Sequence, residues 1–113
     1  ALPDGKYEIG WAVGKSDIKE KFHKYWRDKK HKVVWFASLK NPEIMKMTGR
    51  SGFGIHPDGG NPGTMGCVGI RSRDTVPVRN ALRRTSLKKR HLFVRYVTEE
   101  DLQALWLRAQ GIT

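Results

Sequence analysis

Residues 52–70 read GFGIHPDGGNPGTMGCVGI, two short apolar runs joined by a connector rich in glycine and proline. The stretch holds the single cysteine of the chain, Cys67, and places a histidine, His56, eleven positions before it. The ten residues between them include four glycines and two prolines, which favour tight turns. Residues 53–55 and 68–70 therefore predict two strands joined by a return of the chain that brings His56 and Cys67 side by side.

A cysteine beside a histidine is the arrangement of a nucleophile with its base. An imidazole that takes the thiol proton produces the reactive thiolate, and the resulting ion pair lowers the pKa of the thiol. Gly66 leaves nearby backbone N–H groups open to an oxyanion, while Gly54 and Gly69 keep both strands thin where a peptide substrate could lie. The alternative for the same residues is a buried structural cysteine and a surface histidine.

Residues 47–71 resemble the signature of L,D-transpeptidase (YkuD-type) catalytic domains. That signature is a strand ending in histidine, followed by Ser/Thr-x-Gly-Cys and an aliphatic residue, which this chain carries from Thr64 to Val68. The spacing is most similar to small members found in phage lysins and bacterial antagonistic effectors. Many members have an arginine two residues after the cysteine, where this chain has Gly69, and the nearest arginine is Arg71.

The resemblance implies a peptidoglycan-active enzyme in which His56 deprotonates Cys67 and the thiolate attacks an L,D amide of a stem peptide, forming a thioester acyl-enzyme. It implies that the N–H groups of Gly66 and Cys67 hold the oxyanion. It calls for no metal or cofactor. The residues expected to contact the substrate are Thr64, Arg71, Gly54 and Gly69.

The group that attacks the thioester decides which reaction occurs, and the sequence motif is the same for hydrolysis and for transpeptidation. Water gives carboxypeptidase or endopeptidase activity, which we favour because the chain is compact, strongly basic and without an obvious insertion that would gate the substrate. The first alternative is an L,D-transpeptidase that cross-links or exchanges stem-peptide residues. The second is a non-enzymatic basic module that binds nucleic acid or an anionic surface.

A zinc hydrolase ranks last among the interpretations. His23, His31 and His91 have no cysteine or acidic partner at the spacing of a zinc site. The remaining arrangement is a mixed site of His56, Asp58 and Cys67, and nothing else in the chain resembles a zinc peptidase pattern.

Length and composition fit one small domain spanning residues 1–113. With 38% hydrophobic residues the chain can bury a modest core, and a single cysteine excludes an internal disulfide. We expect synthesis in the cytoplasm, where the thiol stays reduced, and action in the bacterial periplasm or cell wall. The chain begins at Ala1 rather than methionine, which is compatible with a fragment of a longer protein.

Charge indicates anionic partners. Lysine and arginine number 22 against 11 acidic residues, a net charge of +11 that attracts polyanions. Stem-peptide carboxylates and other anionic cell-envelope polymers carry the matching sign, and nucleic acid is expected only as a nonspecific electrostatic ligand. The longest apolar run, residues 33–37, is far shorter than the ~20 residues of a membrane span.

Hydrophobic periodicity predicts a β-rich α+β domain, a small mixed β-sheet or sandwich with peripheral helices, and the resemblance implies an L,D-transpeptidase-like fold. Alternation predicts a first strand with Tyr7, Ile9, Trp11 and Val13 on its buried face. A helix is predicted from an N-cap at Ser16 to about Lys30, with an apolar stripe of Ile18, Phe22, Tyr25 and Trp26 opposite the basic residues Lys15, Lys19, Lys24, Arg27 and Lys30. The other expected elements are strands at 33–38, 52–56 and 91–97, a loop at 39–50 around Asn41 and Pro42 with room for one helical turn, a short helix capped by Asp74 near Pro77, and a last helix that follows the capping sequence 98–101 and stops at Gly111.

Overall fold

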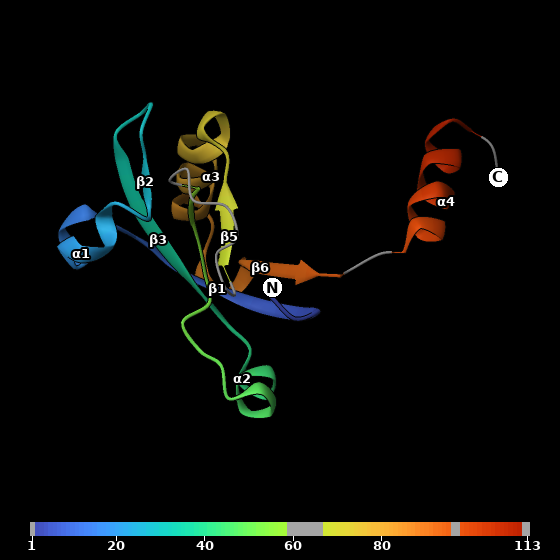
Figure 1. Cartoon of the computed structure of the whole chain (residues 1–113), viewed down its shortest axis with the longest axis horizontal. Helices are drawn as coiled ribbons and strands as arrows, with labels where there is room; N and C mark the ends of the chain where they lie inside the picture. Colours follow the sequence, from blue (N-terminus) through green and yellow to red (C-terminus); the bar gives the residue numbers. More distant parts are fainter. Residues whose placement is uncertain (1, 59–66, 96–97, 112–113) are drawn as a thin grey trace.

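The protein is described by a computed structural model that covers residues 2–58, 67–95 and 98–111. In it a curled, six-stranded mixed sheet is surrounded by helices (Figure 1), which confirms the small α+β class. The strands are β1 (Gly5–Gly14), β2 (Arg27–Asp28), β3 (Val33–Lys40), β4 (Gly54–Pro57), β5 (Cys67–Ile70) and β6 (His91–Val94). The helices are α1 (Glu20–His23), α2 (Pro42–Thr48), α3 (Ser72–Arg84) and α4 (Glu99–Ala109), with 3-10 turns η1 (Lys15–Asp17) and η2 (Leu87–Lys89).

The sheet runs in the order β5-β4-β3-β1-β6, and β2 pairs with β3 beside this path. Its pairs are antiparallel except for β4 and β5, which are parallel. The sequence predicted that the chain turns back between β4 and β5, which would make them antiparallel, and this prediction is wrong. Gly54 lies opposite Cys67, and His56 lies opposite Gly69.

The pleat of the sheet divides its side chains between two faces. On one face Trp35, Ala37 and Leu39 of β3 join Ile55 of β4 in the buried core. Helix α3 covers this face, and its buried Thr75 accepts a hydrogen bond of 3.0 Å from the indole Nε1 of Trp35. Residues that alternate with these along each strand, such as Phe36 in β3 and His56 in β4, point to the opposite face.

Strand β1 confirms the predicted alternation only in its first half. Tyr7 and Ile9 are buried, but Trp11 is 53% exposed and Ala12 is buried in its place. The pairing of β1 with β3 shifts register between Ile9 and Ala12, and such an irregularity exchanges the faces of the residues that follow it. The carbonyl of Ala12 accepts hydrogen bonds from Nε and Nη2 of Arg83 in α3, at 3.2 and 3.1 Å.

The helix predicted for residues 16–30 is wrong beyond one turn. The chain instead forms η1, the four-residue α1 and then β2, so Ser16 does not cap a long helix. Strand pairing and aromatic packing override the helical period, because Arg27 pairs with Val34 while Trp26 stacks on Phe36. At the following turn, the Asp28 carboxylate accepts hydrogen bonds from the backbone N–H and Nδ1 of His31, at 2.8 and 2.5 Å.

The remaining elements follow their capping signals. The segment expected as a loop contains α2, capped by the side chain of Asn41, which accepts from the N–H of Ile44, and ended by Gly49 at φ 66°. Helix α3 begins at Ser72, earlier than predicted, and holds Pro77 inside it. Strand β6 ends at Val94, and Val97 lies outside the described residues.

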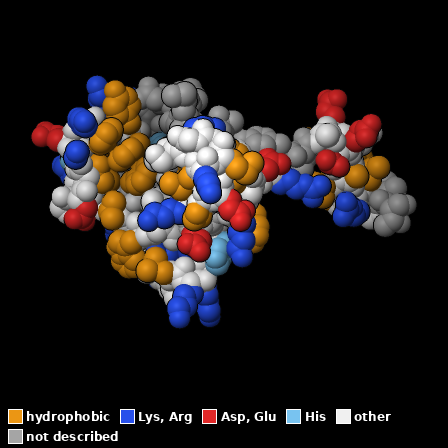
Figure 2. All heavy atoms as spheres, turned by 90° about the horizontal axis from the view of Figure 1, so that it is seen from below, with side chains coloured by type: hydrophobic (Ala, Val, Ile, Leu, Met, Phe, Trp, Pro, Cys, Tyr) orange, Lys and Arg blue, Asp and Glu red, His pale blue; other side chains and the backbone are white. Residues whose placement is uncertain are grey.

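Helix α4 forms where the capping sequence predicts it. Thr98 and Asp101 make a reciprocal capping box, with hydrogen bonds of 3.1 and 3.2 Å. The helix lies apart from the sheet, and hydrophobic and acidic side chains are visible on its surface (Figures 1 and 2). In the part of the chain that the structure describes, no helix has the length and apolar character to cross a membrane.

Candidate functional site

His56 and Cys67 share the sheet face opposite α3. Parallel pairing places Cys67 across from Gly54, two residues from His56 along β4, so both side chains point to this face. Strand spacing and rise put their Cα atoms roughly 8 Å apart, a diagonal relation that an imidazole can bridge. The two residues therefore share one face as diagonal rather than directly opposed neighbours, and their partnership as nucleophile and base stays a prediction.

His56 is held in one tautomer. Its Nδ1 lies 2.6 Å from the carbonyl oxygen of Pro57, and because a carbonyl can only accept, Nδ1 carries the proton. In the neutral ring Nε2 then keeps its lone pair, and among the described residues this buried atom has no hydrogen-bond partner. Burial lowers the pKa of His56 below its ordinary value, although the bond to Pro57 and the charge of Asp58 raise it in part. The imidazole is therefore a neutral base at neutral pH.

Cys67 is half-buried at the start of β5. Its Sγ lies 3.8 Å from the carbonyl oxygen of Gly52, a long contact in which the thiol donates. Burial raises the pKa of the Cys67 thiol, and a backbone hydrogen bond from Gly54 lowers it in part. The sequence-based expectation of a lowered thiol pKa is wrong for this structure, because burial outweighs the groups that favour the thiolate. The resting pair is a neutral thiol with a neutral imidazole.

An aromatic stack covers His56 and was not predicted as part of the site. Phe36 stacks nearly parallel to the His56 ring with centroids 6.2 Å apart, and Trp26 lies 5.8 Å from it. Trp26 also stacks on Phe36 at 4.3 Å and on Phe22 at 4.9 Å. The alternation of β3 could have placed Phe36 on this face, whereas Trp26 was assigned to a helix that does not form.

Gly54 lies beneath this stack. A Cβ atom built at Gly54 would overlap the ring of Phe36, so a protein side chain rather than a substrate accounts for glycine in this structure. Gly69 is exposed, and a Cβ there would lie 3.3 Å from Oδ1 of Asp58. Its contact with substrate stays a prediction.

Arg71 lies away from Cys67. It is exposed at the N-cap position of α3, beyond the end of β5, and four residues of extended chain separate it from Cys67 by about 13 Å. Arg71 is therefore at the His56 end of the strand pair. Asp58 is at the same end, since its N–H donates to the carbonyl oxygen of Ile70 at 3.0 Å.

Two predicted site residues, Gly66 and Thr64, lie outside the described residues. The oxyanion site is therefore described only from Cys67 onward. Within the described ranges, no three histidine, cysteine or acidic side chains gather closely enough to hold a metal ion. His56, Asp58 and Cys67, all of which are described, do not form such a group.

Comparisons with models of protein families, with curated proteins and with solved structures return no match for this chain.

Proposed function

We propose that the chain is a cysteine-dependent hydrolase that cleaves an L,D amide bond in peptidoglycan stem peptides, acting in the bacterial periplasm or cell wall. The observation that carries the proposal is the tautomer of His56. Its Nδ1 is bonded to the carbonyl of Pro57, so the buried Nε2 bears the lone pair on the sheet face that it shares with Cys67. The substrate class rests on the sequence resemblance of residues 47–71.

The proposed reaction starts from the neutral pair. His56 Nε2 takes the thiol proton of Cys67 as the sulfur attacks the substrate carbonyl carbon, so the charged pair forms only during attack. The carbon–nitrogen bond of the tetrahedral intermediate then breaks, and the imidazolium returns the proton to the leaving amine. Water, deprotonated by His56, cleaves the thioester and restores the thiol.

The electrostatics of the site support this order. Burial disfavours both the thiolate of Cys67 and the imidazolium of His56 when each is considered alone. Proton transfer between them creates two opposite charges at short range, which offset each other's cost in a site of low dielectric. The aromatic stack of Phe36 and Trp26 maintains that environment on the His56 side.

The test is mass spectrometry of purified muropeptides after incubation with the protein. Hydrolysis adds one water to the cleaved fragments, whereas transpeptidation yields cross-linked or exchanged products. We expect hydrolysis products from the unaltered chain. Turnover should be lost in Cys67→Ser and fall by about 10²–10⁴-fold in His56→Ala.

Control variants separate chemistry from folding. Cys67→Ser should keep the circular dichroism spectrum and urea midpoint of the parent, because the side chains have nearly the same shape. Cross-linked or exchanged products would refute hydrolysis and support the transpeptidase alternative. Full turnover in Cys67→Ser would refute the cysteine mechanism. The absence of any product from the unaltered chain would refute the substrate class.

A further inference from the structure

The segment from η1 to the start of β3, residues 15–32, is strongly basic, and we call it the basic arm. It carries eight cationic residues against three acidic ones. The cations are Lys15, Lys19, Lys21, Lys24, Arg27, Lys29, Lys30 and Lys32, and the acids are Asp17, Glu20 and Asp28. Asp28 is buried and bonded to His31, which leaves fewer anions to neutralise the arm's surface.

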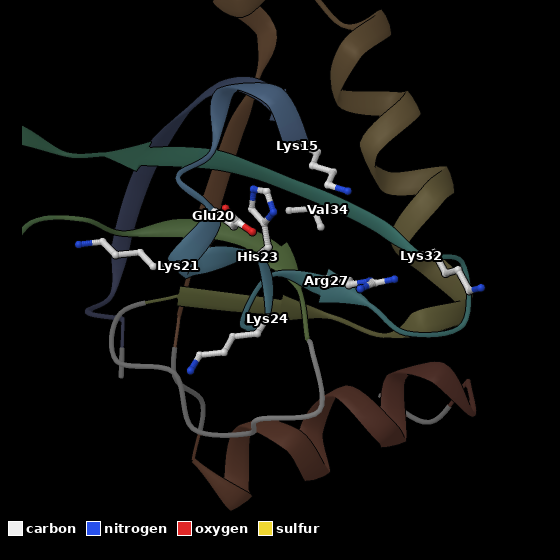
Figure 3. Close-up of a pocket in the computed structure, with 8 residues that line it drawn as sticks. All are labelled: Lys15, Glu20, Lys21, His23, Lys24, Arg27, Lys32 and Val34. Carbon is white, nitrogen blue, oxygen red and sulfur yellow. The ribbon is translucent and has the colours of Figure 1, made fainter.

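Part of this charge lines a hollow in the surface. A pocket of about 510 Å³ opens between α1, β2 and β3, a volume within the range of ligand-binding sites. The residues that line it are Lys15, Glu20, Lys21, His23, Lys24, Arg27, Lys32 and Val34, five of which are cationic and one of which carries a carboxylate. In Figure 3, Lys15, Arg27 and Lys32 extend to one side of His23, and Lys21 and Lys24 extend to the other.

The basic surface continues past this pocket. A second hollow of about 260 Å³ is lined by Lys24, Arg27 and Lys29, so two cations belong to both. A single phosphate would meet only some of these groups. A chain of repeated phosphates could meet several in turn, because the cations are spread over two adjoining hollows and on both sides of His23.

The aromatic side chains of the arm argue against a ligand that stacks bases. Trp26 has Phe22 and Phe36 on its ring at 4.9 and 4.3 Å, so its faces are occupied. Lys21 lies over the Phe22 ring at 5.1 Å, and Lys24 lies over the exposed Tyr25 at 4.9 Å. Binding of single-stranded nucleic acid relies on open aromatic platforms beside the charges. Tyr25, the exposed ring of the arm, already has Lys24 over it, so the arm offers many charges and little open aromatic surface.

We infer that the two hollows of the basic arm form a binding site for a polyol-phosphate polymer of the cell envelope, recognised through its repeated phosphodiesters. This site goes beyond the proposed reaction, although the choice of a cell-envelope polymer rests on the proposed action at the wall. Its place is nevertheless relevant, because Phe22 and Trp26 connect the arm to the stack over His56. A polymer held here would keep the protein at the wall with the Cys67 face nearby.

The test measures binding in the Cys67→Ser chain, so that catalysis has no part in it. The probe is teichoic acid of the glycerol-phosphate type, followed by calorimetry at two salt concentrations. The site variant Lys15→Gln/Arg27→Gln/Lys32→Gln is compared with Lys46→Gln/Arg84→Gln/Lys88→Gln, which removes the same charge from exposed positions elsewhere. We expect the site variant to bind at least about fivefold more weakly and the control to stay within about twofold of the parent.

A second probe, single-stranded oligothymidylate with the same number of phosphates, separates the two sources of phosphodiesters. We expect it to bind no more tightly than the teichoic acid at the same salt. Tighter binding of the oligonucleotide would assign the arm to nucleic acid and overturn the inference. If both triple variants lose the same affinity for teichoic acid, binding depends on net charge alone and the inferred site is refuted. The absence of teichoic acid binding by the parent would also refute it. If teichoic acid does not bind but the chain that keeps Cys67 still cleaves muropeptides, the inferred site fails and the proposed function stands.

Discussion

Replacing Gly54 by alanine tests whether the aromatic stack over the candidate site is packed as described. The added Cβ overlaps the ring of Phe36, and that ring cannot easily withdraw because it stacks on Trp26 at 4.3 Å and beside His56 at 6.2 Å. Overpacking of this kind costs about 1–3 kcal/mol, while removing a glycine from the unfolded chain returns about 0.4–1 kcal/mol. We expect a net loss of about 1–2 kcal/mol in the free energy of unfolding.

The assay is urea denaturation followed by tryptophan fluorescence, with Gly69→Ala as the matched control on the neighbouring strand. Alanine at position 69 meets Oδ1 of Asp58 at 3.3 Å and the Cα and Cβ atoms of the same residue at 3.4 and 3.5 Å, with no overlap, so its effect should lie within about 0.5 kcal/mol. In a Phe36→Ala background the overlap at residue 54 is gone, and Gly54→Ala should then cost nothing. A loss that is the same with and without the Phe36 ring would refute the packing argument.

The same substitution has a consequence at the site. A displaced Phe36 ring uncovers His56, and because burial is the main cause of its lowered pKa, that pKa should rise toward the ordinary value of about 6.5. Titration of the His56 ring protons by NMR measures this. An unchanged pKa in Gly54→Ala would show that the stack does not desolvate the imidazole.

Three further predictions concern stability. Thr75→Val should lower the free energy of unfolding in urea by about 1–3 kcal/mol, because it leaves the buried indole N–H of Trp35 without its acceptor. Thr75→Ser keeps the hydroxyl and should cost less, and equal losses in the two variants would contradict this. The pKa of His56 is lower in the folded chain than in the unfolded one, so the unfolded chain binds the proton first and the free energy of unfolding should fall as pH drops below about 6.5. His56→Gln should remove that part of the pH dependence, and an unaltered profile would contradict it. Thr98→Ala removes the cap of α4, which at 11 residues is marginal by itself, so amide exchange in residues 99–109 should accelerate while the urea midpoint of the sheet stays the same.

Local sequence was sufficient where one element's own residues decide its structure. The apolar run at 33–38 predicts β3, and the capping sequence at 98–101 predicts α4, because strand alternation and the capping box depend on near neighbours. The bulge in β1 escaped prediction since it depends on pairing with β3 rather than on β1 alone. Trp11, placed on the buried face by alternation, is exposed for that reason.

The segment at 16–30 shows how a helical period can arise without a helix. Phe22 and Trp26 are four residues apart and do stack on each other, but the ring of Phe36 from β3 completes the cluster. The pairing of Arg27 and Asp28 with β3 then requires extended backbone directly after Trp26. The periodic pattern indicated the residues that pack together and not the backbone that joins them.

The motif predicted that His56 and Cys67 lie on neighbouring strands, which they do, but it could not supply their electrostatics. Burial shifts both pKa values, and around His56 the rings of Phe36 and Trp26 come from distant parts of the sequence. The predicted return of the chain between β4 and β5 was wrong, because a connector rich in glycine and proline is compatible with either direction and the strands are parallel. Parallel pairing changed the neighbour of Cys67 from His56 to Gly54.

The parallel register also ties the candidate chemistry to the core. In β4 and β5, Ile55, Val68 and Ile70 pack toward the core, while His56 and Cys67 alternate with them on the other face. A slip of β5 by one residue would move Cys67 to the core face and expose apolar side chains, at a cost of roughly 0.8 kcal/mol for each CH₂ group that leaves the core. The burial that stabilises the sheet therefore fixes the face on which the thiol lies. Substitutions that weaken core packing at Val68 or Ile70 are expected to disturb the position of Cys67 before they unfold the protein.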